Sequence, residues 1–131
     1  MMNPVPRYDA VVFPVGNGFG VEVCRRDDRF GRGVCMSLHC GEVEVMRFDL
    51  FEPAHLHFAV EQGDAPRIIF PPGPIEQHVA RALWDLRHNA TAAIVMCSDA
   101  RVLGRGPDWE AFDATMPAIE AALARAREGQ S

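Results

Sequence analysis

The stretch that most constrains the fold runs from Val45 to Phe58 and reads VMRFDLFEPAHLHF. Apolar and polar residues alternate on both sides of Glu52-Pro53-Ala54, and such alternation around a turn is typical of an antiparallel hairpin. Successive residues of a strand point to opposite faces of a sheet. One face of this hairpin would therefore carry the apolar residues Met46, Phe48, Leu50, Leu56 and Phe58, and the other the ionisable residues Arg47, Asp49, His55 and His57.

The residues around this hairpin continue the strand pattern. Strands are expected over residues 8–15, 21–26 and 34–40 before it, and over 67–70 after it. Keeping the apolar positions in register requires a turn centred on Asp27-Asp28-Arg29-Phe30 and three-residue loops at Gly41-Glu42-Val43 and Glu52-Pro53-Ala54. The sequence thus predicts an antiparallel β-meander of about five or six strands between residues 8 and 70.

From Pro74 onward the apolar period changes to three or four residues, which is typical of amphipathic helices. One such stripe begins at Ile75 and reaches Cys97, and a break at residues 87–91 would make it one long helix or two in tandem, with a short strand over 92–97 as the alternative. A second stripe runs from Trp109 to Ala126, and Pro117 inside it predicts a kink or restart near residues 113–116. We expect an α+β fold in one domain, residues 1–131, with two or three helices over 74–128 covering one face of the sheet.

Charge and hydropathy exclude several classes of protein. The net charge is −5 and the arginines are interleaved with acids, so no basic stripe is available for nucleic acid. The longest apolar run, residues 92–97, is too short to span a membrane, and no signal segment is visible, so we expect a cytoplasmic protein. The cysteines at 24, 35, 40 and 97 form no C-x-x-C pair and are expected to be buried thiols.

The expected register extends the polar face across several strands. The expected pairs are Asp49 with His57, Phe51 with His55, and Cys35 with Asp49. If Val23 also lies opposite Val34, Glu22 joins this line. Directly opposite residues have Cβ atoms about 4.5 to 5.5 Å apart. One row of functional groups would then cross four strands, formed by Glu22, Cys35, Asp49 and His57.

Three interpretations of this row remain open. A carboxylate beside an imidazole fixes its tautomer and raises its basicity, and His55 and His57 can both reach a metal, with Asp49 or Cys35 completing a zinc or iron site. Cys35 beside His57 or Arg47 would instead suit a nucleophile. The alternative is an ordinary solvated polar face. Because the apolar residues Val43, Val45 and Phe51 are expected on this face too, a ligand or second subunit would partly cover it.

The segment Arg47-Phe48-Asp49, with Phe51 and then His55-x-His57, resembles a bacterial family of small proteins marked by R-F-D-x-F followed by H-x-H. In that family aromatic residues accompany the histidines and a helical C-terminus follows. The resemblance implies a domain of unknown function and brings no activity with it. It directs attention to Arg47, Asp49, His55 and His57.

Two functions follow as hypotheses, and whether the chain is an enzyme stays open between them. The first is a cytosolic accessory protein without a cofactor, homodimeric through the polar face, in which Arg47 and the two histidines bind a small polar or anionic ligand, with Asp49, Cys35 and Glu22 around it. The second is a zinc- or iron-dependent enzyme with His55 and His57 as ligands and Asp49 or Cys35 completing the set.

Overall fold

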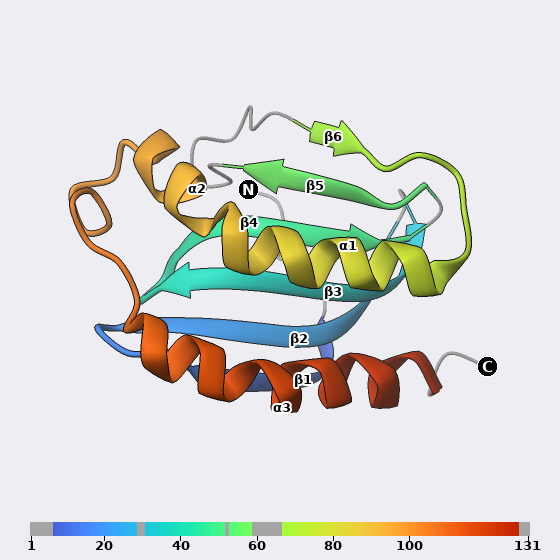
Figure 1. The fold of residues 1–131 in the computed structure, drawn as a ribbon. Coiled ribbons are helices and arrows are strands. Elements are labelled where there is room, and N and C mark those ends of the chain that lie inside the picture. The colour runs from blue at the N-terminus through green and yellow to red at the C-terminus, as the bar shows by residue number, and fades with distance from the viewer. Residues whose placement is uncertain (1–6, 29–30, 52, 59–66, 129–131) are drawn as a thin grey trace.

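The computed structural model of the chain describes residues 7–28, 31–51, 53–58 and 67–128. In this part of the chain, strands come first and helices follow (Figure 1). The strands are β1 (Arg7–Pro14), β2 (Phe19–Asp28), β3 (Gly31–Cys40), β4 (Val43–Leu50), β5 (His55–Phe58) and β6 (Arg67–Ile69). The helices are α1 (Ile75–His88), α2 (Ala90–Met96) and α3 (Trp109–Glu128).

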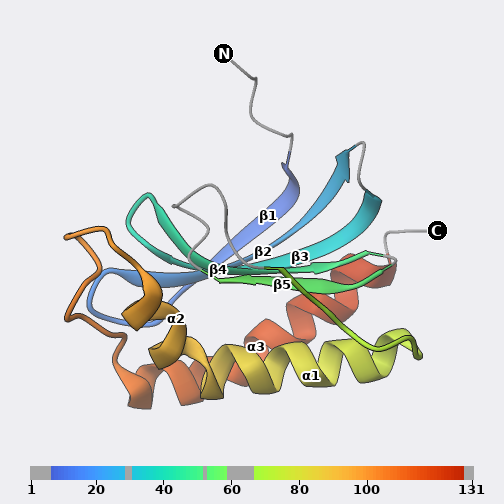
Figure 2. The ribbon, with the colours of Figure 1, turned by 90° about the horizontal axis from the view of Figure 1, so that it is seen from above.

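The strands form one antiparallel sheet in the order β1-β2-β3-β4-β5-β6, so each strand pairs with its neighbours in sequence. Figure 2 shows α1, α2 and α3 together on one side of this sheet. The predicted α+β fold, with a meander followed by helices that cover one face, is confirmed. We call the opposite face, which no described helix covers, the far face. No helix in the described ranges combines the length and the apolar character needed to cross a membrane.

The main core lies between the sheet and the helices. Phe48 and Met36 from the sheet and Leu86, Phe112 and Ile119 from the helices are all fully buried there. Burying such side chains stabilises a fold by about 1.5 to 3 kcal/mol each relative to leaving them exposed. The apolar half of the alternating pattern therefore anchors the sheet, and its polar half is presented on the far face.

The first helical stripe forms two helices in tandem, and the strand alternative for residues 92–97 is wrong. The break falls at Asn89, whose side chain donates a 2.7 Å hydrogen bond to Asp85 and whose backbone N–H bonds to the Asp85 carbonyl. Helix α3 continues through Pro117, so the expected restart near residues 113–116 does not occur. Buried Phe112 and Ile119 hold the helix against the sheet on both sides of the proline.

The register between β4 and β5 differs from the expected one by two residues. Asp49 lies opposite His55 and Arg47 opposite His57, so the expected pairs Asp49–His57 and Phe51–His55 are wrong. The reason is that Phe51 leaves the strand and packs into a small cluster with Cys24 and Cys35, which lengthens the loop to residues 51–54. A shift of two residues preserves the face on which each side chain lies.

The register between β2 and β3 also differs. Both strands extend further than expected, β2 to Asp28 and β3 from Gly31, and residues 29–30 of the predicted turn lie outside the described residues. Glu22 consequently lies opposite Ser37, and Cys24 takes the place opposite Cys35. The expected pair of Cys35 with Asp49 is confirmed.

Of the three apolar residues expected on the far face, Phe51 lies there but Val43 and Val45 do not. The β3–β4 connection is the two-residue turn Gly41-Glu42, and an irregularity after Leu38 restores the pairing. Val43 and Val45 belong to the main core, and Phe51 is buried in its own cluster. These residues therefore offer no exposed apolar surface for a second subunit.

Candidate functional site

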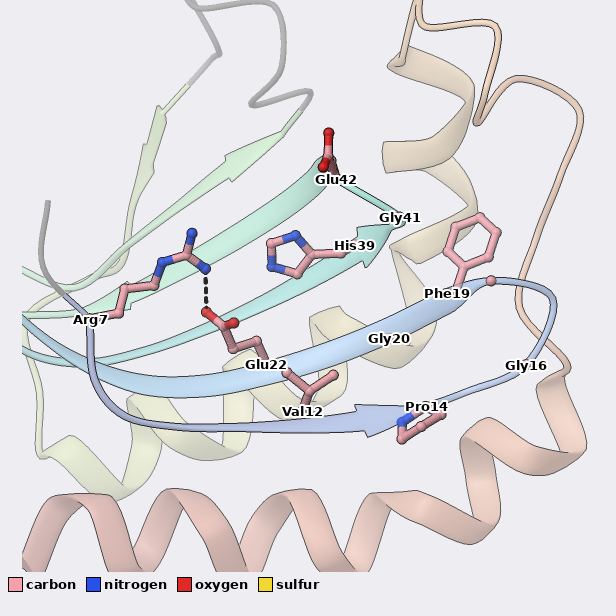
Figure 3. Close-up of a pocket in the computed structure, with 11 residues that line it drawn as sticks. Arg7, Val12, Pro14, Gly16, Phe19, Gly20, Glu22, His39, Gly41 and Glu42 are labelled. Carbon is pink, nitrogen blue, oxygen red and sulfur yellow. Dashed lines mark hydrogen bonds and ion pairs between the residues drawn. The ribbon is translucent and has the colours of Figure 1, made fainter. Parts of the chain in front are cut away.

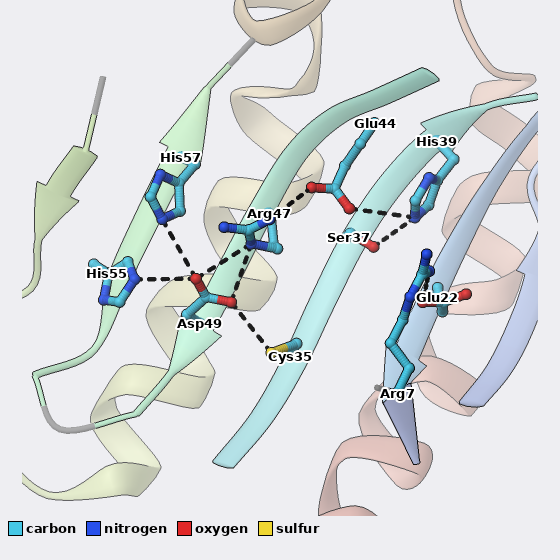
Figure 4. Close-up of polar contacts among 10 residues, drawn as sticks. All are labelled: Arg7, Glu22, Cys35, Ser37, His39, Glu44, Arg47, Asp49, His55 and His57. Atoms are coloured by element: carbon cyan, nitrogen blue, oxygen red, sulfur yellow. Dashed lines mark hydrogen bonds and ion pairs between the residues drawn. The ribbon is translucent and has the colours of Figure 1, made fainter. Parts of the chain in front are cut away.

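Asp49 is the centre of a polar cluster on the far face (Figure 4). It is only 3% exposed. Its Oδ2 lies 3.0 Å from His55 Nε2 and 3.3 Å from His57 Nε2. Its Oδ1 accepts a hydrogen bond of 3.2 Å from the Cys35 thiol. Arg47 Nε lies 3.2 Å from both carboxylate oxygens, so side chains from three strands converge on one carboxylate.

The surroundings of Asp49 keep it ionised. Burial by itself raises the pKa of a carboxyl group, but hydrogen bonding by His57, the charge of Arg47 and the Cys35 thiol outweigh it and hold the pKa of Asp49 well below its usual range. A buried carboxylate needs such partners, because an unpaired charge in a protein interior is costly. The site therefore presents a fixed negative charge beside two imidazoles.

His55 is oriented by the loop that precedes it. Its Nδ1 lies 2.9 Å from the carbonyl oxygen of Pro53. A carbonyl oxygen only accepts, so Nδ1 carries the proton, and in the neutral ring Nε2 then has a lone pair. That lone pair faces Asp49 Oδ2, which is also an acceptor, at 3.0 Å. The pair is favourable only when Nε2 is protonated as well or when both atoms bind the same cation.

This arrangement matches that of a metal-ligating histidine, which typically donates its other ring N–H to a backbone carbonyl or a carboxylate. Asp49, His55 and His57 offer ligand atoms that all lie within 4.8 Å of one another. Around a tetrahedral zinc with bonds of about 2.0 to 2.1 Å, neighbouring ligand atoms are about 3.3 to 3.5 Å apart. The two N–O separations, 3.0 and 3.3 Å, are close to that spacing.

Arg47 is already paired with acidic groups. Besides its contact with Asp49, its Nη1 lies 3.0 Å from Glu44 Oε1. An anionic ligand at the guanidinium group would meet the negative charges of these two carboxylates. The geometry thus makes Arg47 a residue that positions Asp49 more readily than one that receives an anion.

Glu22 lies outside the cluster around Asp49. It forms a 2.6 Å ion pair with Arg7. Both residues line a surface pocket of about 600 Å³ that also contains His39 and Phe19 (Figure 3). The predicted row of four residues therefore divides: Cys35, Asp49 and the histidines contact one another, whereas Glu22 bonds to Arg7 and shares the lining of a smaller cavity with Cys35.

Sequence reasoning missed residues that adjoin the site. Glu44 bridges Arg47 and His39, whose Nε2 lies 3.9 Å from Glu44 Oε2 and 2.7 Å from the Ser37 hydroxyl. Cys24 lies opposite Cys35. Strand parity already places Ser37 and His39 on the far face, but the strand irregularity after Leu38, which brings Glu44 opposite His39, has no signal in the residue pattern.

The comparisons with known proteins returned no match, either to a family model, to a curated protein or to a solved structure. The resemblance to the R-F-D-x-F … H-x-H family therefore stays a prediction. Function has to be argued from the site itself.

Proposed function

We propose that this chain is a metal-dependent protein that binds a divalent transition-metal ion, zinc or iron(II), through Asp49, His55 and His57. The observation that carries the proposal is the orientation of His55, whose Nδ1–H is directed to the Pro53 carbonyl while Nε2 faces the Asp49 carboxylate at 3.0 Å. A cation bound by both Nε2 and Oδ2 would remove the repulsion that these two acceptors have when the His55 ring is neutral.

The ligand set indicates the kind of metal. Two imidazoles and one carboxylate suit zinc, and the same set with open positions is typical of non-haem iron(II) sites. Structural zinc sites are closed by four protein ligands, whereas catalytic sites keep a position for water or substrate. Three protein ligands therefore favour a catalytic role, in which the ion polarises a bound water or a substrate carbonyl.

Cys35 and Arg47 support the ligands instead of joining them. Both contact the Asp49 carboxylate, and Cys35 does so at Oδ1, the oxygen that does not face the imidazoles. Groups that orient ligands in this way commonly change metal affinity by 10- to 100-fold when they are lost. The proposal assigns both residues this positioning role.

The first test is metal analysis of protein purified without a histidine tag, once in air and once without oxygen. We expect close to one equivalent of zinc or iron. Asp49→Asn and His57→Ala should each lose it, and His78→Ala should keep it, because His78 lies on α1 and bonds to the Pro71 carbonyl. A metal-free wild-type protein that also fails to take up added zinc would overturn the proposal.

A spectroscopic test separates this site from adventitious binding. Cobalt(II) bound by two nitrogens and one carboxylate in a tetrahedral site absorbs visible light strongly, whereas the hydrated ion does not. We expect this absorption in the wild type and in His88→Ala, a control at an exposed histidine of α1. The same absorption in His55→Ala would place the ion elsewhere.

The cytoplasmic location, the homodimer and the binding of a small polar ligand are proposals that rest on the sequence. Light scattering at two protein concentrations tests the dimer, and cell fractionation tests the location. Phe51→Glu is unsuitable for the dimer test, because Phe51 is 4% exposed and its replacement would disturb the fold. Val12→Glu is the better variant for the dimer test, because Val12 lies on the edge strand β1 and is 59% exposed.

A further inference from the structure

Cys24 and Cys35 lie directly opposite each other on the adjacent antiparallel strands β2 and β3. We propose that they form a reversible disulfide when the protein meets a peroxide, so that this pair is a site of oxidative modification. Cys35 also bonds to the proposed metal ligand Asp49, but the disulfide does not require a bound metal.

The register brings the two residues within disulfide range. Opposite residues of antiparallel strands have Cα atoms about 4.5 or 5.5 Å apart, and disulfides span Cα separations of about 4.4 to 6.8 Å. The Cβ atoms of opposite residues are about 4.5 to 5.5 Å apart, against about 3.5 to 4.5 Å in a disulfide. The strands therefore need to approach by about 1 Å, without a change of fold.

The other two cysteines are placed differently. Cys40 and Cys97 belong to the main core between the sheet and the helices, whereas Cys24 and Cys35 form the small cluster with Phe51. Cys40 lies opposite Phe19 on β2, so no cysteine faces it across the hairpin. Proximity thus singles out one pair among the four cysteines.

A small oxidant has a route to this pair. Both cysteines line a cavity of about 150 Å³ on the far face, together with three arginines, Arg7, Arg26 and Arg47, and two acidic residues, Glu22 and Glu44. The thiolate is the form that attacks a peroxide. The Cys35 thiol donates its proton to Asp49, so we assign the first attack to Cys24.

The chemistry balances in two steps. The Cys24 thiolate attacks one peroxide oxygen, the O–O bond breaks, and after proton uptake the products are Cys24 sulfenic acid and water, or an alcohol for an organic peroxide. The Cys35 thiol then attacks the Cys24 sulfur, the S–O bond breaks, and the hydroxyl leaves as water with the thiol proton. Two thiols are oxidised, the peroxide is reduced, and a dithiol reductant reverses the change.

The test is treatment of the purified wild-type protein with hydrogen peroxide, followed by thiol counting and peptide mapping without reductant. We expect the count to fall from four thiols to two and to recover with dithiothreitol. Cleavage after arginine should then release residues 8–25 linked to residues 33–47. Four thiols remaining, or oxidation to sulfinic acid without a link, would overturn the proposal.

Matched variants identify the partner, because residues 33–47 also contain Cys40. Cys40→Ser and Cys97→Ser should still form the link, and Cys24→Ser should not. A link that is lost in Cys40→Ser and kept in Cys35→Ser would contradict the assignment. Peptide mapping of the wild-type protein detects the disulfide without any variant. The test therefore still holds if one of the variants fails to fold.

Discussion

Cys35 and Asp49 face each other across β3 and β4, and the Cys35 thiol donates a 3.2 Å hydrogen bond to Asp49 Oδ1. Oδ2 is the oxygen that the two imidazoles approach. The thiol therefore fixes the rotation of the carboxylate on the side away from the proposed metal. This relationship makes Cys35 a positioning residue that can be tested separately from the ligands.

Replacing Cys35 with alanine should weaken zinc binding about 10-fold, because the carboxylate loses a donor that orients it. Cys35→Ser should keep affinity within about 3-fold, since a hydroxyl donates from nearly the same place. Calorimetric titration with zinc measures both. Cys97→Ala is the matched control, because it removes a buried thiol from the helical side of the core. Equal affinities for the alanine and serine variants would contradict the positioning role.

Acid should destabilise the metal-free protein through Asp49. The pKa of this carboxyl is lowered in the folded state, so the stability it contributes is present above the unfolded pKa of about 3.9 and is lost as pH falls toward the folded value. Such a shift is worth about 2 to 3 kcal/mol at neutral pH. Urea unfolding in chelator, from pH 7 down to pH 2, compares the wild type with Asp49→Asn. The difference in unfolding free energy between the two proteins should shrink at low pH. A difference that stays constant would show that the Asp49 carboxylate is not its source.

The amino-acid pattern of this chain predicts well on which face of the sheet each strand residue lies. Alternation places Arg47, Asp49, His55 and His57 on the face opposite Phe48, and the two-residue error in register between β4 and β5 does not change that face. The cluster was therefore predictable, although its pairing was not. Strand β4 ends before Phe51, which packs against Cys24 and Cys35. An aromatic residue in an alternating run is equally compatible with a longer strand, so the sequence does not show where β4 ends.

The missed contacts have a common physical cause. Cys24 replaces Glu22 opposite Cys35 because β2 and β3 pair closer to their turn than expected, and Val45 enters the core because of an irregularity in the β3–β4 pairing. Both depend on turn geometry. Period-two alternation is the same for every even shift, so it does not set the β2–β3 register, and the one-residue irregularity after Leu38 has no signal in it. Residue pattern alone cannot distinguish such registers.

The start of α3 should depend on Gly16. This glycine has φ +87°, and a Cβ there would overlap the side chain of Asp108, whose N–H bonds to the Val15 carbonyl at 2.9 Å. Gly16→Ala should therefore cost about 2 kcal/mol or more in unfolding free energy, from backbone strain and overlap together. Gly106→Ala is the control, because a Cβ there meets nothing within 4 Å. Urea unfolding should show almost no change in unfolding free energy for Gly106→Ala. An equal loss in both variants would contradict the close contact between Gly16 and Asp108.

The Asp108 side chain should cap α3. Its Oδ1 accepts hydrogen bonds from the backbone N–H groups of Glu110 at 3.1 Å and Ala111 at 3.2 Å. Removing such a cap typically costs about 1 kcal/mol, and asparagine replaces aspartate well at this position. Asp108→Ala should thus lower the unfolding free energy by about 1 kcal/mol, whereas Asp108→Asn should leave it nearly unchanged. Chemical denaturation checks both, and a loss of the same size in the asparagine variant would argue against a capping role.

Zinc should raise the thermal stability of the folded protein through the ligands on β4 and β5. An ion that binds the native state adds about 2.7 kcal/mol when its free concentration is 100 times the dissociation constant. For a domain of this size that corresponds to a rise in Tm of roughly 8 to 13 °C. Differential scanning calorimetry with zinc and with chelator measures the shift. His57→Ala should abolish it and His78→Ala should retain it, because His78 lies on α1 and bonds to the Pro71 carbonyl. An equal shift in both variants would show that the stabilising ion binds outside Asp49, His55 and His57.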